Sequence, residues 1–180
     1  QKGTTVSFTV AFQCSPYTEQ SRYATSLAGL KVLVVDDNEM ARTVFQDMLT
    51  GLTLVPTAVS SALEAYEELR RADQARQPYK LALIDWRMPD ISGIEAAEHI
   101  QRMKLQTTPL LILVTAFGRS ELQSRAEEVG IRQVLYKPIS PSQLFNSVLE
   151  AVQVEGRLPV RAAGGVADKP LRQFNGLNVL

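Results

Sequence analysis

Five side chains suited to phosphoryl or metal chemistry follow short apolar segments of this sequence. Asp36 and Asp37 follow KVLVV, Asp85 follows KLALI, Thr115 ends a segment that begins LLILV, and Lys137 follows QVLY. Three carboxylates packed together repel one another, so a hard cation is nearly required to hold them. Metal, ammonium and hydroxyl around one carboxylate suit a phosphoryl group, whose oxygens need their charge neutralised. A carboxylate can itself accept that group as an aspartyl phosphate.

This chemistry requires the five residues to meet at one place. The segments that precede or contain them, residues 31–35, 80–84, 110–114 and 133–136, are predicted to be strands, with a further strand at 52–57. Three of these segments are apolar nearly throughout, which is typical of parallel strands covered on both faces. Amphipathic helical stretches alternate with them. The pattern predicts an α/β fold, a five-stranded parallel sheet that is doubly wound with right-handed crossovers. Such a sheet binds ligands beyond the carboxyl ends of its strands.

The helices are predicted from their apolar faces and their caps. Two faces repeat at helical spacing: Ala41, Val44, Phe45, Met48 and Leu49, and then Leu144, Phe145, Val148, Leu149 and Val152. Gly51 should end the first helix. Ser140 with Gln143, and Ser92 with Glu95, have the spacing of a capping box at a helix start. Taken alone, Asp36 and Asp37 could also be carboxylates that stabilise a helix N-terminus.

The remaining charged residues have simpler interpretations. His99, the only histidine, has no metal-ligand partner nearby in the sequence and is expected on a helix surface. A solvated helix face is the simplest interpretation of Glu64, Glu67, Glu68, Arg70, Arg71 and Asp73.

The composition excludes several classes of protein. The 180 residues suffice for one domain with extensions, and the 19 basic residues balance 19 acidic ones, which argues against a nucleic-acid or anionic-membrane binder. The longest apolar run, LLILV, is far below a membrane span. The single cysteine, Cys14, allows no internal disulfide and favours a reducing compartment. Neither glycine-rich nucleotide-binding motif follows the first strand, and no helix-turn-helix pattern follows Val152.

Four motifs, in this order at the strand ends, carry a resemblance to a known family. VLVVDDN, LIDWRMPDISG, LVTA and YKPIS together resemble the response-regulator receiver domain, over residues 29–153. The resemblance implies the flavodoxin-like receiver fold. It also implies that Asp85 is the phosphoacceptor. Asp37 and Asp85 would bind Mg²⁺ (or Mn²⁺) directly, Asp36 mainly through water, and Arg87 through its backbone carbonyl.

The resemblance also assigns the switch residues. Thr115 would bind a phosphoryl oxygen and move toward it, and Lys137 would pair with the phosphoryl group. Pro138 would follow a cis peptide bond, as in the family. Receivers often carry an aromatic residue three positions before this lysine, where the chain has Val134, whereas Tyr136 lies one position before it.

The flanks extend the resemblance to a longer protein. Residues 1–15 resemble the last strand of a histidine-kinase ATP-binding domain, and residues 16–28 are a predicted linker. Residues 154–175 form a second predicted linker, and residues 176–180, GLNVL, repeat the start of the receiver and would open a second one. This order is that of a hybrid sensor histidine kinase.

The expected function is that of a phosphoacceptor receiver in a two-component phosphorelay. The chain lacks the kinase catalytic core but would catalyse phosphorylation and dephosphorylation of Asp85. Expected partners are the kinase core and phosphohistidine domain of the same parent chain, with a downstream histidine phosphotransfer domain or second receiver. No contact with nucleic acid or membrane is expected. The chain would lie on the cytoplasmic side, the parent being anchored in the inner membrane by upstream segments. The alternative is a receiver-fold docking module that regulates the kinase with little dependence on phosphorylation.

Overall fold

The sheet contains five parallel strands, as predicted. The computed structural model describes residues 27–116 and 125–154. Within them the strand order is β2-β1-β3-β4-β5, and every pairing is parallel. The strands are β1 Lys31–Val35, β2 Val55–Val59, β3 Leu81–Asp85, β4 Leu110–Thr115 and β5 Gln133–Tyr136. The predicted strand, linkers and second-receiver start in residues 1–26 and 155–180 lie outside the described residues.

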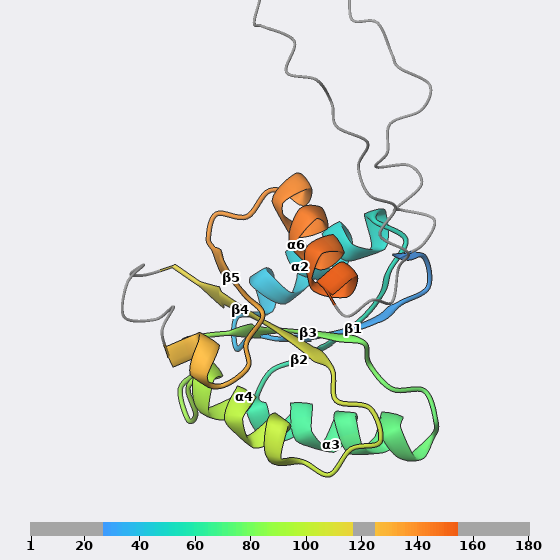
Figure 1. Cartoon of the computed structure of the whole chain (residues 1–180). Coiled ribbons are helices and arrows are strands. Elements are labelled where there is room, and N and C mark those ends of the chain that lie inside the picture. The colour runs from blue at the N-terminus through green and yellow to red at the C-terminus, as the bar shows by residue number, and fades with distance from the viewer. Residues whose placement is uncertain (1–26, 117–124, 155–180) are drawn as a thin grey trace, which may run out of the picture.

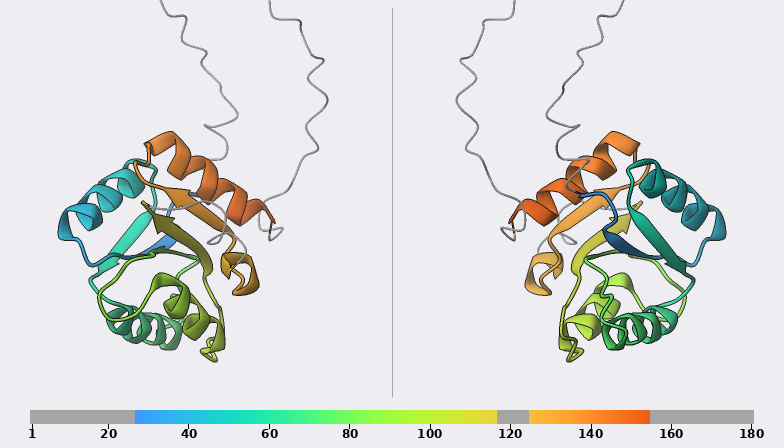
Figure 2. Two further views of the ribbon diagram at one scale, coloured as in Figure 1. Left: turned by 90° about the vertical axis from the view of Figure 1, so that its left-hand side faces the viewer. Right: turned by 90° about the vertical axis from the view of Figure 1, so that its right-hand side faces the viewer.

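Helices cover both faces of this sheet. They are α2 Glu39–Gly51, α3 Ala62–Gln74, α4 Gly93–Arg102 and α6 Pro141–Val154. α2 and α6 lie on one face, and α3 and α4 on the other (Figure 1). The side views show the same three layers (Figure 2). Residues 125–128 are also helical, while 117–124 of the helix expected before β5 lie outside the described residues. None of the described helices is long and apolar enough to span a membrane.

The double covering explains the unbroken apolar strands. Each face of the sheet carries its own core, one under α3 and α4 and the other under α2 and α6. Successive side chains of a strand point to opposite faces. The side chains on both faces of a strand are therefore shielded from water, and all five residues of β3 are buried.

The helix starts confirm the sequence analysis at two positions. Ser92 and Glu95 form a complete capping box at α4. Ser140 and Gln143 exchange the equivalent two bonds before α6, at 3.2 and 2.9 Å. At α2 the cap is Asn38, whose side chain accepts from two backbone N–H groups of the first turn. Asp36 and Asp37 precede this cap, so neither of them caps the helix.

The predicted bounds of one strand and the predicted buried face of one helix were wrong. The strand predicted at 52–57 is β2 Val55–Val59, because Leu52 and Thr53 turn the chain out of α2, Thr53 with a φ of 65°. Val44, placed on the buried face of α2, is 45% exposed. β2 is an edge strand, and α2 buries mainly Phe45 and Leu49 against the sheet.

Tyr79, just before β3, predicts a stability change at alkaline pH. It is 2% exposed, donates its hydroxyl to Glu68 and has the ammonium of Lys31 above its ring. Burial, and then the Glu68 hydrogen bond, raise the pKa of Tyr79 from 10.0 to about 12. A raised folded-state pKa stabilises the fold below the unfolded value, and that contribution is lost as the pH rises from 10 toward 12. The wild type should lose roughly 2 kcal/mol more than Tyr79→Phe across this window. Urea unfolding at both ends of the window measures the difference, and equal losses would contradict it.

Candidate functional site

Strand ends from across the sheet surround one small cavity. Its volume is about 230 Å³, and the residues that line it are Asp36, Asp37, Asn38, Asp85, Arg87, Thr115, Ala116 and Lys137. All five residues with which the sequence analysis began are among them. They come from the ends of β1, β3, β4 and β5, which the parallel pairing brings to the same edge of the sheet. The cavity has room for several water molecules, each of which occupies about 30 Å³ in the liquid.

Lys137 links two carboxylates in this cavity. Its Nζ lies 2.6 Å from Asp85 Oδ1 and 2.9 Å from Asp36 Oδ2. Its backbone N–H donates to the carbonyl of Thr115 at 2.7 Å, which ties it to the end of β4. The bond between Lys137 and Pro138 is cis, as the resemblance implied. The ammonium therefore offsets the charge of both buried carboxylates.

Asp85 is held by contacts to both of its carboxylate oxygens. It is the last residue of β3 and is 8% exposed. Its Oδ2 accepts from the backbone N–H of Arg87 at 2.8 Å, while Oδ1 faces Lys137. Burial raises the pKa of Asp85, and the bonds from Lys137 and Arg87 offset this only in part. The carboxylate is thus held in place but incompletely neutralised.

The pKa of Lys137 reflects the same balance. Burial alone lowers its pKa, but the hydrogen bonds to Asp85 and Asp36 outweigh burial, and the net shift is upward. The side chain therefore remains an ammonium at neutral pH, the form that can bind an anion.

Asp36 and Asp37 differ in their surroundings. Asp36 is 2% exposed, and its Oδ1 accepts from the backbone N–H of Asn38 at 2.9 Å. Arg42 donates to the backbone carbonyl of Asp36 at 2.7 Å. The sequence analysis did not single out Arg42, since one arginine on a helix carries no signal of such a contact. Asp37 is exposed and lines the cavity.

Gly93 packs closely against the backbone of Asp85. A Cβ at Gly93 would lie 2.3 Å from the backbone oxygen of Asp85 and 2.9 Å from Leu113 Cδ1. Its N–H donates to the carbonyl of Trp86 at 2.9 Å. A side chain at this position would therefore collide with the backbone that carries Asp85. Gly93 is the last residue of the motif LIDWRMPDISG in the sequence analysis, which gave no reason for a glycine there.

The donor set fits a magnesium ion with few protein ligands. In residues 27–116 and 125–154, no three His, Cys, Asp or Glu side chains are close enough to form a metal-ligand cluster. Mg²⁺ keeps several waters and is usually bound through one or two carboxylates. Asp37 and Asp85 line the same cavity as Arg87, whose backbone carbonyl the resemblance adds to the set. The exposed position of Asp37 leaves room for metal-bound water.

Thr115 and Val134 occupy the positions at which the resemblance predicts a switch. Thr115 is 2% exposed at the end of β4 and is paired in register with Tyr136. Val134 is partly buried against the core beneath α3 and α4. The aromatic ring of β5 is therefore carried by the residue next to Lys137.

Comparison with known proteins gives the family. The sequence model described as the response regulator receiver domain matches residues 32–149. The response regulator protein PilR of Pseudomonas aeruginosa is 31% identical over 124 residues, which are 69% of this chain and 26% of PilR. The signal transduction histidine-protein kinase BarA of Escherichia coli K12 is 29% identical over 138 residues, 74% of this chain and 14% of BarA.

A solved structure gives the same fold. The chemotaxis protein CheY4 of Vibrio cholerae superposes with a TM-score of 0.61 at 23% identity, over 69% of this chain and 99% of that one. The chain spans about a quarter of PilR and less of BarA, so these comparisons concern one domain of each longer relative. With the family match over residues 32–149, the chain belongs to the response regulator receiver domain family of two-component signalling.

Proposed function

We propose that this receiver accepts a phosphoryl group on Asp85 from a phosphohistidine, with Mg²⁺, as part of a hybrid sensor histidine kinase. The observation that carries the proposal is the position of Lys137 Nζ, 2.6 Å from Asp85 and 2.9 Å from Asp36. A phosphoryl group on Asp85 Oδ1 would lie within reach of the ammonium, since that oxygen already contacts it.

Three residues of this chain, Asp85, Lys137 and Thr115, would take part directly in the phosphoryl transfer. A carboxylate oxygen of Asp85 forms the new bond to phosphorus while the bond from phosphorus to the histidine nitrogen breaks, and the histidine leaves with its electron pair. Lys137 binds the phosphoryl oxygens, and Thr115 donates its hydroxyl to one of them. Burial raises the pKa of Asp85, which reflects weak solvation of its charged form and favours attack.

The neutralisation of charge also involves residues that would hold a metal ion. Asp37, Asp85 and the backbone carbonyl of Arg87 would hold Mg²⁺, with Asp36 acting through water. When bound, the ion would supply positive charge that stabilises the phosphoryl group.

The hybrid-kinase context is supported by two observations. BarA, a histidine-protein kinase by name, matches over 74% of this chain. Residues 1–15 and 176–180 resemble the end of a kinase domain and the start of a second receiver. The partners would be the kinase core and phosphohistidine domain of the same chain, followed by a phosphotransfer domain or second receiver.

A second candidate function is favoured by Val134. If the missing aromatic weakens the link between Thr115 and the surface, the domain would dock to the kinase with little dependence on phosphorylation. Covalent labelling of Asp85 by acetyl phosphate, followed by mass spectrometry and amide NMR, tests both. Labelling without any change in the spectrum of β5 and α6 would favour docking, and labelling with such a change would favour the switch.

Lys137→Met should destabilise the fold at neutral pH. The change leaves Asp36 and Asp85 buried without their shared cation, which costs about 3–5 kcal/mol for fully buried pairs. Because the lysine side chain is 31% exposed, we expect a loss of about 1–3 kcal/mol. Urea unfolding measures it. Lys104→Met, at an exposed lysine, is the matched control, and an equal loss in the two variants would contradict the prediction.

A further inference from the structure

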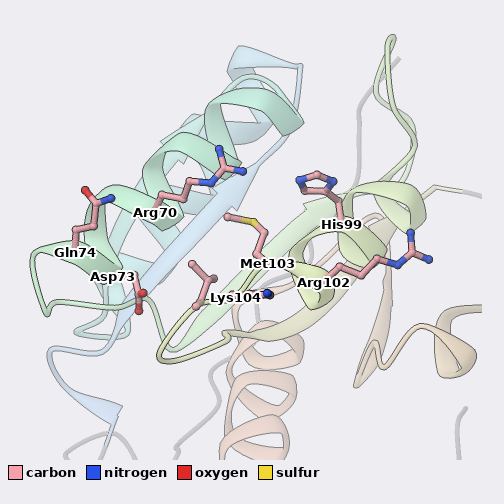
Figure 3. A pocket seen from close by; sticks show the side chains of 8 residues that line it. Arg70, Asp73, Gln74, His99, Arg102, Met103 and Lys104 are labelled. Carbon is pink, nitrogen blue, oxygen red and sulfur yellow. The ribbon is translucent and has the colours of Figure 1, made fainter.

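A second and larger cavity lies between the carboxyl ends of α3 and α4. Its volume is about 550 Å³, and it shares no lining residue with the cavity at Asp85. In Figure 3, Arg70 extends from α3 toward His99 and Met103 of the neighbouring segment, whereas Arg102 extends away from α3. The cavity falls within the range of about 300–1,000 Å³ that small-molecule sites occupy.

The charges around this cavity are unbalanced. Arg70, Arg102 and Lys104 line it together with one carboxylate, Asp73. Arg102 is neutralised by Glu98, at 3.1 Å. Among the residues that the structure describes, neither Arg70 nor Lys104 forms an ion pair. Two cationic side chains at one cavity are thus left without an acidic partner.

Helix ends do not account for these two cations. Basic side chains in the last turn of a helix stabilise its carboxyl end. Arg71 has this position in α3, and His99 and Arg102 have it in α4. Arg70 precedes the last-turn arginine of α3, and Lys104 follows the end of α4. Neither therefore belongs to the last turn of its helix.

The carboxylate of Asp73 holds the two sides of the cavity together. It accepts from the backbone N–H of Gln106 at 3.1 Å and of Thr107 at 3.4 Å. These bonds tie the loop after α4, which carries Lys104, to α3, which carries Arg70. The same hydrogen bonds partly neutralise the carboxylate of Asp73. The backbone segments that carry Arg70 and Lys104 are therefore linked to each other, which lowers the entropic cost of binding a ligand between them.

An aromatic ring forms a third element of the cavity. The imidazole of His99 stacks on Tyr66, with ring centroids 4.2 Å apart and planes at 30°. Tyr66 is buried, so its ring anchors that of the exposed His99 at the edge of the cavity.

We infer that this cavity binds a small molecule that carries phosphate groups, at a site distinct from Asp85. Guanidinium and ammonium groups are the side chains that recognise phosphate, arginine through two parallel hydrogen bonds. A diphosphate carries several negative charges in a volume that fits within a cavity of about 550 Å³. The inference is independent of phosphoryl transfer at Asp85.

The single histidine of the chain gives a specific probe. The sequence contains one histidine, so in an untagged protein every imidazole signal in the NMR spectrum belongs to His99. Pyrophosphate, adenosine diphosphate and adenosine are titrated at constant pH without divalent cations, so that the acidic cavity at Asp85 repels the anions. Saturable shifts of the His99 signals and of the amides at 103–107 are expected with the first two ligands only.

The matched variants separate binding from net charge. Arg70→Gln/Lys104→Gln should raise the Kd for pyrophosphate at least about tenfold, the effect of losing one charge-assisted hydrogen bond or more. Arg125→Gln/Arg132→Gln removes the same charge at exposed residues outside the cavity and should leave the Kd within about twofold, because salt screens distant charges. Amide signals outside the cavity check that both variants fold.

Four results would overturn the inference. They are the absence of saturable binding, equal binding of adenosine and adenosine diphosphate, an unchanged Kd in Arg70→Gln/Lys104→Gln, and tighter binding of an oligoglutamate peptide than of pyrophosphate. The last result would assign the cavity to an acidic protein segment instead.

Discussion

Asp85→Asn is expected to abolish phosphoryl incorporation from acetyl phosphate in the presence of Mg²⁺. The amide keeps the shape of the side chain but has no anionic oxygen to attack phosphorus. No other carboxylate shares the position of Asp85, 2.6 Å from Lys137 and bonded to the N–H of Arg87, in the described part of the chain. Intact-protein mass spectrometry measures the fraction labelled. We expect a loss of at least about a hundredfold, in line with removal of a nucleophile.

The stability of this variant distinguishes lost chemistry from lost folding. Burial raises the pKa of Asp85, so folding favours its protonated form. Stability from this group is fully present below the unfolded pKa of 3.8 and is lost as the pH rises through the higher folded value. At neutral pH a neutral asparagine should therefore leave the fold as stable as the wild type, or more so. Thermal unfolding of both proteins checks the sign.

Asp90→Asn is the matched control for labelling. Asp90 is an exposed carboxylate in the turn that follows Asp85, and the same change of charge there should leave incorporation intact. Equal labelling of Asp85→Asn and the wild type would refute Asp85 as the acceptor. Addition of a chelator to the wild type should reduce labelling as well, since in the proposed mechanism Mg²⁺ would supply part of the positive charge at the phosphoryl group.

Gly93→Ala should be one of the most destabilising single changes in this domain. The added Cβ would lie 2.3 Å from the backbone oxygen of Asp85, 3.0 Å from its carbonyl carbon and 2.9 Å from Leu113 Cδ1. Backbone atoms of a central buried strand cannot yield as a flexible side chain does. We expect a loss of about 3 kcal/mol or more in the free energy of unfolding, within the range of severe steric changes. Urea unfolding measures the loss.

Gly51→Ala provides a control with the opposite expected sign. Gly51 is the last residue of α2, and a Cβ there would meet nothing within 4 Å. Alanine in a helix is favoured over glycine by about 0.5–1 kcal/mol, so this change should be neutral or stabilising. Slower phosphorylation of Gly93→Ala, in conditions where it remains folded, would show that the clash displaces Asp85. Equal stability of the two variants would refute the close approach.

The sequence determined the parts of this protein that depend on local pattern. Apolar segments of strand length alternating with amphipathic helices predicted the sheet, because residues covered on both faces must be apolar throughout. Ser92 with Glu95 marked the start of α4, since a cap bonds only within its own first turn. The polar residues at the strand ends predicted one site, because carboxyl ends of parallel strands share an edge.

The tertiary structure decided what depends on contacts between distant segments. The helix face interpreted as solvated contains Glu68, which accepts from Tyr79, and Asp73, which holds the loop after α4. Val44 is exposed where the pattern placed it inside. The reason for glycine at 93 is the backbone oxygen of Asp85, and only the packing of α4 on the sheet brings the two together. Charge and spacing along the chain carry no record of such distances, so the shared ammonium of Lys137 and the cationic cavity between α3 and α4 became visible only in the folded molecule.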